Sequence, residues 1–546
     1  MNAPTIIRHL IGTALLAGPL AGLELDYEYS RWTSPEIDGG GTVGVQAAAL
    51  SSNGLHAAAY WHEYVYEGAV EYPLPGFGTR WTVQPSATTA LRSTAYPGVR
   101  PLAISSQGLA VGELYTSLRR WEIGFPMSAS GSVVTRRGTI RGRMAHLDDA
   151  GQWIVGTLWP TAPATTGRSV FANARSRLWN GVTATPTNPL AGTSQANAPS
   201  MGLRISPNGR WIAGAILDPT TLSGTIYIKD RLSGAEPALI PPPFQAPGGF
   251  EVLAVSNTGE AVMSWGSLLW EDNFGLWPDG TPVAVEGTGY QRIYRWNGTA
   301  LTALSPEEVT ISDGSGWSET GPVIGARGSF AWVGGGMGLM GIMDIAFDVD
   351  DMGGFHRAVF MYRNGGFDPD PVQWVFAPAN GGSCINAQGQ ILSGYGPLTL
   401  RTPLPRVSLV GGNIARGEQG GPMALTVSRG AGPFGPATTT WPLTVKLRYG
   451  GTAQRGVDYL APLTVTIPAG KTSVGLTLTP INDALAEDAE AISISIVSQR
   501  TGDGPRGSYL AHGTAFRTGI TLMDDDAVAR IPDRSGDADG DPHRAP

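Results

Sequence analysis

The stretch Arg204-Ile-Ser-Pro-Asn-Gly-Arg-Trp-Ile-Ala-Gly214 joins one short apolar segment to another through a polar turn that contains a glycine. Serine and asparagine side chains in such a turn bond back to the local backbone, and glycine takes the positive φ that reverses the chain. The stretch therefore predicts a tight β-hairpin.

The same pattern recurs along the chain before residue 405. We count seven copies, the sixth of them degenerate, and their turn glycines are Gly54, Gly108, Gly151, Gly209, Gly259, Gly328 and Gly389. Aromatic segments that end in a polar turn, such as Tyr294-Arg-Trp-Asn-Gly298, lie between several copies. The spacing suits four-stranded blades with loops of variable length. The repeat predicts an N-terminal β-propeller of about seven blades over residues 40–402.

Two of these stretches resemble known repeats. His356-Arg-Ala-Val-Phe-Met-Tyr-Arg-Asn-Gly365 and Ile385-Asn-Ala-Gln-Gly-Gln-Ile-Leu-Ser-Gly394 resemble the HAF repeats of exported bacterial propellers. The stretch Ile205–Ala213 is similar to the repeats of TolB-type propellers. The resemblance implies a β-propeller in a protein exported by a bacterium.

From Pro405 the pattern changes to alternating segments without the propeller turn. Seven short segments are predicted as strands, at residues 407–410, 423–427, 443–449, 463–467, 473–479, 491–497 and 514–522. That many strands in so short a region favour an antiparallel β-sandwich over residues 405–526. The predicted fold class is all-β, with the propeller followed by the sandwich.

Acidic residues of the C-terminal region gather in the loops that follow its first, third, fifth and seventh predicted strands. They are Glu418, Asp458, Asp483, Glu487, Asp488, Glu490, Asp524, Asp525 and Asp526. Because successive strands of a sandwich alternate in direction, these four loops should lie at the same end of the domain.

So many carboxylates in one place call for a cation. Like charges about 4 Å apart repel by ~4 kcal/mol at an effective dielectric constant near 20. Ca²⁺ fits best because it accepts six to eight oxygen ligands with flexible geometry, and the region has no thiolate that would attract a softer metal. The alternative interpretation is that these are ordinary solvated loops.

Four stretches in this region resemble the Calx-beta motif. They are Gly451–Tyr459, Val465–Ser473, Ile481–Glu490 and Ile520–Asp526, in the order of the motif. The resemblance implies an immunoglobulin-like sandwich with Asp458, Asp483, Glu487 and the run Asp524, Asp525 and Asp526 as calcium ligands. Arg416 and Asn482 stand where the motif is commonly acidic, with Glu418 as a substitute for the former, which implies fewer or weaker ions.

Composition excludes several classes of protein. The 546 residues exceed what one core organises, and 76 glycines with 42 prolines indicate many turns. A net charge of -8 with 15% charged residues offers no basic face to nucleic acid or to an anionic membrane. Cys384 is the single cysteine, which excludes an intramolecular disulfide framework.

The N-terminal stretch predicts export, and the C-terminal stretch predicts disorder. Residues 1–23 carry a short apolar run that resembles a secretory signal peptide and is too short to span a membrane. No other stretch could cross a bilayer, so we expect a secreted, periplasmic or cell-surface protein. Residues 527–546 are polar and rich in Pro, Gly and Asp, which predicts a disordered tail.

No catalytic motif stands in the sequence: there is no G-x-S-x-G, no H-E-x-x-H and no phosphate-binding glycine loop. We therefore predict no catalytic residue, and Ca²⁺ is the one cofactor expected. The first hypothesis is an exported binding or adhesion protein whose propeller holds an extracellular protein or a glycan. The alternative is a secreted glycan-processing enzyme, with two carboxyl groups ~5–9.5 Å apart in the propeller channel. Whether the chain is an enzyme stays open at this point.

Overall fold

The structure of the protein is a computed structural model. It describes residues 27–32, 45–67, 70–83, 86–91, 98–115, 125–130, 133–136, 141–159, 172–181, 185–221, 223–243, 249–266, 292–312, 318–334, 338–348, 355–363, 366–367, 383–393, 398–412, 414–431, 439, 441–500 and 507–526. The predicted signal peptide and the predicted C-terminal tail lie outside the described residues. The chain divides into two compact units, the first built mainly from residues up to Leu404 and the second from residues after it.

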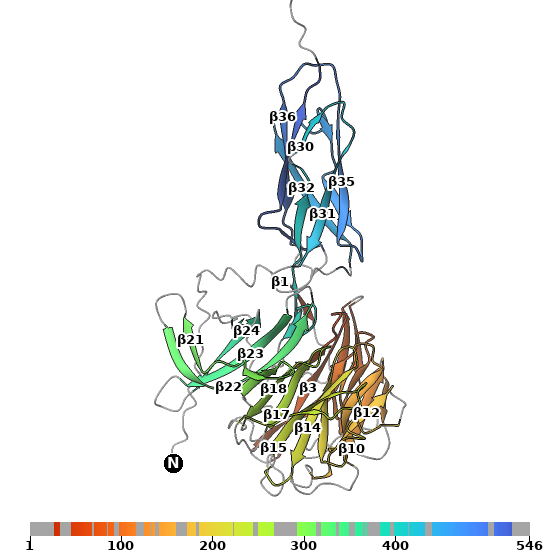
Figure 1. Ribbon diagram of the computed structural model, residues 1–546, viewed down its shortest axis with the longest axis vertical. Coiled ribbons are helices and arrows are strands. Elements are labelled where there is room, and N and C mark those ends of the chain that lie inside the picture. The colour runs from red at the N-terminus through yellow and green to blue at the C-terminus, as the bar shows by residue number, and fades with distance from the viewer. Residues whose placement is uncertain are drawn as a thin grey trace, which may run out of the picture. The chain divides into compact units, whose positions relative to one another are not determined.

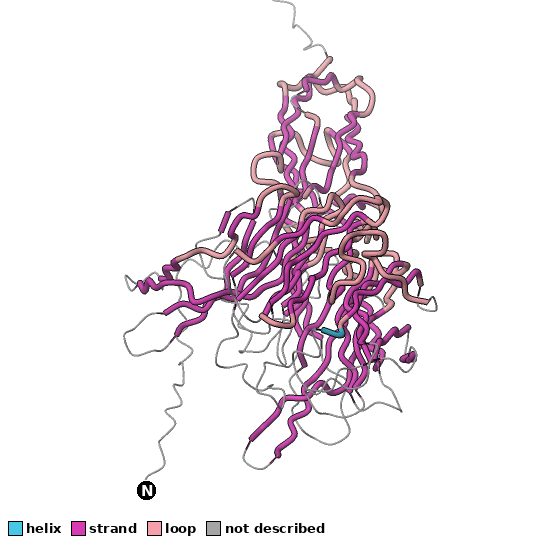
Figure 2. Tube along the Cα trace, turned by 60° about the horizontal axis from the view of Figure 1, so that its bottom comes forward, coloured by secondary structure: helices cyan, strands magenta, loops and turns pink. Residues whose placement is uncertain are grey.

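The first unit contains seven antiparallel sheets in its described part (Figures 1 and 2). Their strands, sheet by sheet, are β2 (Val45–Leu50), β3 (His56–Glu67), β4 (Val70–Val83) and β5 (Ser86–Leu91); β6 (Gly98–Ile104), β7 (Ala110–Tyr115), β8 (Phe125–Ser130) and β9 (Val133–Arg136); β10 (Arg141–Leu147), β11 (Trp153–Trp159) and β12 (Arg175–Asn180); β13 (Ser200–Ile205), β14 (Trp211–Asp218), β15 (Ser223–Asp230) and β16 (Ala238–Ile240); β17 (Gly249–Val255), β18 (Ala261–Gly266), β19 (Arg292–Trp296) and β20 (Leu301–Ala303); β21 (Glu308–Ser312), β22 (Ser318–Val333), β23 (Gly338–Asp348), β24 (Phe355–Arg363) and β25 (Gly366–Phe367); and β1 (Tyr27–Trp32) with β28 (Leu398–Pro403), β27 (Ile391–Ser393) and β26 (Ser383–Ile385).

These sheets form a closed ring. The strands β2, β6, β10, β13, β17, β22 and β26 each contact the next in this order, and β26 contacts β2. The last sheet is completed by β1, which pairs antiparallel with β28 so that Tyr27 lies opposite Pro403. This arrangement is a β-propeller, as predicted. Because β1 is one of its strands, the expected start at residue 40 lies too far along the chain.

The turn glycines behave as predicted at six of the seven positions. Gly54, Gly108, Gly151, Gly209, Gly259 and Gly389 all have positive φ. The prediction for the remaining glycine, Gly328 of the sixth copy, is wrong: it lies inside β22, opposite Met343 of β23. A Cβ there would lie 2.2 Å from the backbone oxygen of Ile342, so glycine is needed at this position for close strand approach rather than for a turn.

The polar residues of the repeat also connect neighbouring blades. The hydrogen bonds between adjacent turns are Ser52 Oγ with Ser106 Oγ (2.9 Å), Ser106 N to Asp149 O (3.0 Å), Asp149 N to Pro207 O (3.0 Å), Asn208 N to Asn257 Oδ1 (2.9 Å) and Asn386 Nδ2 to Ser51 O (2.9 Å). The last of these joins the final sheet to the first one. The repeated turn therefore does two things: it reverses the chain, and at five of the seven junctions it ties one blade to the next.

The second unit is a sandwich of two five-stranded sheets (Figure 1). In sheet order, the first contains β33 (Tyr459–Leu460), β35 (Ser473–Pro480), β31 (Met423–Gly430), β29 (Arg406–Val410) and β37 (Leu510–Ala511), and the second contains β30 (Ile414–Gly417), β38 (Arg517–Met523), β36 (Glu490–Val497), β32 (Leu443–Gly451) and β34 (Thr464–Ile467). The fold class predicted from the sequence is confirmed, and three short strands, β30, β33 and β37, join the seven that were predicted.

The sandwich core follows from the two-residue period of its strands. Side chains along β31 alternate between buried and exposed, as expected for a strand with one face toward a core. Val427, Val445, Ile467, Leu478 and Ile494 come from five strands of both sheets and are 0% exposed. This apolar interior fixes the strands, and their ends in turn fix the acidic loops described next.

Candidate metal centre

Three carboxylates meet where β30 and β38 end. Glu418, Asp524 and Asp525 each offer an oxygen, and these oxygens lie within 4.8 Å of one another. Glu418 directly follows β30, which runs parallel to β38 and pairs with it through Gly417 and Met523. The backbone N–H of Glu418 donates to Met523 O over 3.1 Å, so the strand pairing itself brings Glu418 to the acidic run after β38.

A second group of three carboxylates lies on the loops around the start of β36. Asp458, Glu487 and Glu490 also offer oxygens that are all within 4.8 Å of one another. Asp458 ends the loop after β32, where its Oδ2 accepts the N–H of Gln454 at 2.5 Å. Its backbone oxygen accepts the N–H of Ile481 at 2.8 Å, which ties this loop to the start of the acidic loop that carries Glu487.

The two groups are connected by hydrogen bonds. The N–H of Glu487 donates to Asp524 Oδ2 at 2.8 Å, and the N–H of Asp526 donates to Asp524 Oδ1 at 2.8 Å. These bonds stabilise the charged form of Asp524 and lower the pKa of its carboxyl group. Asp524 is therefore held as a carboxylate between the two groups.

The other carboxyl groups are crowded by like charge. Burial raises the pKa of Glu418, and Asp483, Asp524, Glu487 and Asp525 raise it further. The pKa of Glu487 and that of Asp526 are raised for the same two reasons, desolvation and neighbouring carboxylates. Such shifts mark a place where negative charge is concentrated without a compensating cation.

Asp458 and Glu490 are also in contact. Desolvation raises the pKa of Glu490, and the nearby charge of Asp458 and a hydrogen bond to its carboxylate raise it further. Glu490 Oε2 and Asp526 Oδ2 are buried atoms that have no hydrogen-bond partner within the described residues. A buried carboxylate oxygen without a partner is costly, and a bound cation would remove that cost.

All seven residues predicted as calcium ligands lie in this region, but they do not all belong to the two groups. Glu418, Asp458, Glu487, Asp524 and Asp525 do. Asp483 and Asp526 lie beside them. The charge of Asp483 raises the pKa of Glu418, and the charge of Asp524 raises the pKa of Asp526. The Oδ1 atom of Asp483 accepts the N–H of Leu485 at 2.7 Å and so shapes the loop.

Sequence reasoning left Glu490 out of the ligand set. The sequence places it in the same acidic loop as Glu487, but the Calx-beta resemblance did not carry it over as a ligand. In the structure it is the first residue of β36. The usable signal was its position: a residue at the first place of a strand can point into the loops at that end of the sandwich.

The donor set fits calcium. Every ligand atom of the two groups is a carboxylate oxygen, which a hard divalent cation prefers. Two of the carboxylates, Glu418 and Asp458, are 6% and 7% exposed, so they are held in place rather than free in solvent. The two groups, with their shared Asp524 link, could hold up to two ions.

Carboxylates of the propeller are arranged differently. In its described part, five ion pairs join an acid to an arginine: Arg100–Glu113, Arg204–Glu251, Arg210–Asp230, Arg295–Glu260 and Arg327–Asp344. The charge of each of these five acids is neutralised by its arginine.

No helix in the described part of the chain is long and apolar enough to span a membrane.

Comparison with known proteins gives likenesses of fold. No protein-family model and no curated protein matches the chain. Among solved structures, the Apo-form Calx CBD1 domain shares 18% identity over 22% of this chain and 99% of its own, with a TM-score of 0.19. A putative TolB from Agrobacterium tumefaciens shares 10% identity over 70% of this chain and 98% of its own, with a TM-score of 0.30. The β-propeller domain of the Trilobed protease from Pyrococcus furiosus shares 8% identity over 80% of this chain and 93% of its own, with a TM-score of 0.29.

Proposed function

We propose that the sandwich is a calcium-binding module and that the whole chain is an exported or cell-surface binding protein. The observation that carries the proposal is the pair of carboxylate groups, Glu418 with Asp524 and Asp525, and Asp458 with Glu487 and Glu490, each within 4.8 Å. The motif resemblance of residues 451–526 supports the same conclusion independently, because it identifies the same loops.

Calcium would act on the sandwich as a structural ion. Its loops repel one another while the carboxylates are charged, and a divalent cation turns that repulsion into attraction. Asp458, Glu487 and Glu490 would hold one ion, and Glu418, Asp524 and Asp525 would hold another. Binding to the folded state alone stabilises that state by mass action.

The propeller would present the ligand surface. A ring of blades offers loops from several sheets at each face, and such scaffolds serve many binding functions. An extracellular protein or a glycan is the expected ligand, and a secreted, periplasmic or surface location follows from the apolar N-terminal residues 1–23. Five of the described propeller acids are paired with arginines, which supports a binding role over a glycan-processing one.

Thermal unfolding of the full chain tests the calcium-binding role. We expect the transition of the sandwich to move to higher temperature in 1 mM CaCl₂ relative to EGTA, while MgCl₂ at the same concentration has little effect. The double variant Asp458→Asn with Asp524→Asn should remove the shift. A calcium shift that survives in the double variant would show that the ion binds elsewhere.

A further inference from the structure

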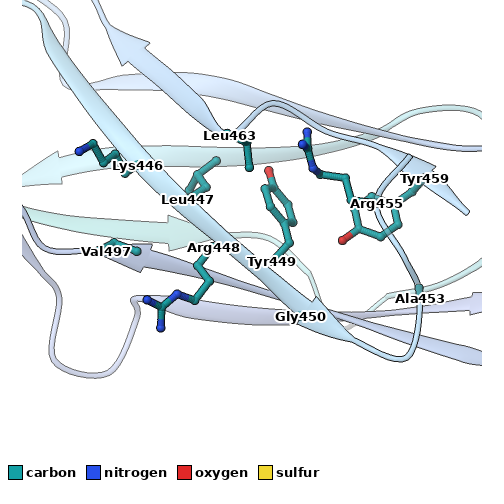
Figure 3. Close-up of a pocket in the computed structure, with 10 residues that line it drawn as sticks. All are labelled: Lys446, Leu447, Arg448, Tyr449, Gly450, Ala453, Arg455, Tyr459, Leu463 and Val497. Atoms are coloured by element: carbon teal, nitrogen blue, oxygen red, sulfur yellow. The ribbon is translucent and has the colours of Figure 1, made fainter. Parts of the chain in front are cut away.

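One groove in the sandwich plays no part in the metal centre. Its volume is about 450 Å³, and it lies beside β32, lined among others by Lys446, Arg448, Tyr449, Arg455 and Leu463 (Figure 3). Figure 3 shows Arg455 and Tyr459 on one side of Tyr449, and Lys446 and Leu447 on the other.

The groove follows a strand edge that is only partly covered. β32 pairs with β36 from Lys446 to Gly451. On its other side β34 covers it only as far as Lys446, opposite Thr464, and one further hydrogen bond runs from Leu447 N to Leu463 O. Within the described residues no strand of the sheet continues along this side of residues 448–451. An extended chain could therefore pair with this edge.

The charge around the groove is positive. Its lining contains Lys446, Arg448 and Arg455 and no carboxylate. Lys446 and Arg448 are exposed, and neither forms an ion pair among the described residues. Arg455 is held in place by a hydrogen bond from Nη1 to Ala461 O at 2.8 Å. In a chain of net charge -8, three cations together at one groove favour an acidic ligand.

An exposed apolar side chain lines the same groove. Leu463 is 53% exposed, which is unusual for a leucine of a small sandwich. Tyr449 is not available as an open stacking surface: its ring lies 6.0 Å from that of Tyr459, and its hydroxyl donates to Pro462 O at 2.8 Å. A leucine beside an open strand edge suits alternate side chains of a peptide better than the face of a sugar.

We propose that this groove binds an extended acidic peptide, which adds as a strand along residues 448–451 of β32. Main-chain hydrogen bonds would give most of the affinity. The acidic side chains of the peptide would meet Lys446, Arg448 and Arg455, and its apolar side chains would contact Leu463. The partner is thus a segment of another protein that alternates acidic and apolar residues.

The probe is a fluorescein-labelled ten-residue peptide of alternating Glu and Val, and the readout is fluorescence anisotropy with the full chain. Measurements are made in EGTA, so that no metal bridges the peptide to the acidic loops and the outcome is independent of calcium binding. We expect saturable binding by the parent protein. The double variant Lys446→Glu with Arg448→Glu should weaken it by about tenfold or more, whereas Lys471→Glu, an exposed lysine of the same domain outside the groove, should not change it.

A second peptide, N-methylated at alternate residues, separates strand addition from charge attraction. It keeps the charge but loses main-chain donors, and we expect it to bind at least about tenfold more weakly. Equal binding of the two peptides would overturn the proposal, as would equal weakening by Lys471→Glu. Polygalacturonate that binds while the peptide does not would likewise overturn it and assign the groove to an acidic polysaccharide. Far-UV circular dichroism confirms that each variant is folded, and Arg455→Gln provides a second groove variant that keeps Lys446 and Arg448.

Discussion

The backbone N–H of Glu487 donates to the carboxylate of Asp524 over 2.8 Å, which joins the loop before β36 to the end of β38. These loops are far apart in the sequence, and each carries part of a different carboxylate group. The bond makes the two groups one connected site, so that a change in one group should be felt in the other.

Single carboxylate variants should separate the two groups. Glu418→Gln removes a ligand from one group and Glu490→Gln from the other, and each should lower the calcium bound by the full chain by about one ion. Equilibrium dialysis followed by elemental analysis measures the bound metal. Asp488→Asn is the matched control, because Asp488 is an exposed acid of the same loop that belongs to neither group. A loss of the same size in Asp488→Asn would indicate that bound calcium follows total charge and not these residues.

Without metal, the sandwich should become more stable as the pH falls from 7 into the range where its crowded carboxyl groups are protonated. The folded-state pKa values of Glu418, Glu487, Glu490 and Asp526 are raised above their ordinary values of 4.5 and 3.8. A raised carboxyl pKa contributes stability that is present below the unfolded-state pKa and is lost as the pH rises through the folded-state value.

In calcium the dependence should reverse, because the ion needs deprotonated ligands and is lost as the carboxyl groups are protonated. Urea unfolding at several pH values, with EGTA and with CaCl₂, measures both curves. Parallel curves under the two conditions would contradict the account. Asp524 titrates with a lowered pKa and adds its opposing contribution only at more acidic pH.

Gly209→Ala should destabilise the propeller more than Gly192→Ala. Both glycines have positive φ, 70° and 79°, and alanine costs about 1 to 2 kcal/mol in that conformation at either position. A Cβ at Gly209 would also lie 2.9 Å from Asp148 Oδ2 and from Trp153 Cδ1 of the neighbouring blade, whereas at Gly192 it would meet nothing within 4 Å. The overpacking should add about 1 to 3 kcal/mol at Gly209. Chemical denaturation compares the two, and equal losses would show that the turn does not press on the next blade.

Asn386→Ala should weaken the closure of the propeller ring. Asn386 is 3% exposed; its Nδ2 donates to Ser51 O of the first sheet, and its Oδ1 accepts the N–H groups of Gln388 and Gln390. Removing it leaves buried polar groups without partners, and the free energy of unfolding should fall by about 3 kcal/mol. Asn180→Ala is the control, since Asn180 is exposed and makes a single exposed bond to Gln152. If both variants lose the same stability, the bond to Ser51 does not close the ring.

Local signals in the sequence predicted the fold well where each turn sets its own geometry. A polar residue followed three positions later by glycine, as at Ser206 and Gly209, fixes a hairpin without help from distant residues. Gly328 stands three positions after Gly325, so its degenerate copy lacks the polar residue of the turn. It lies within a strand of sixteen residues, β22, where the backbone of Ile342 approaches it closely. That contact is set by the neighbouring strand.

The acidic site was predictable as a region and not as a set of contacts. The loops that carry Asp458, Glu487 and Asp524 follow from strand order, but the grouping of Glu418 with Asp525 depends on the short strand β30 pairing parallel with β38. Four residues, Ile414–Gly417, are too few to show an alternating pattern. Glu490 was placed in the correct acidic loop but left out of the ligand set, because its grouping with Asp458 and Glu487 depends on side-chain contacts that the sequence does not show.

Calcium binding by the sandwich can be measured by isothermal titration of CaCl₂ into the full chain, first dialysed against a chelator and then into metal-free buffer. We expect saturable binding of up to two ions, abolished when Asp458→Asn and Asp524→Asn are combined. Absence of any saturable heat at neutral pH, with the chain folded, would contradict this expectation and would leave the acidic loops as solvated surface.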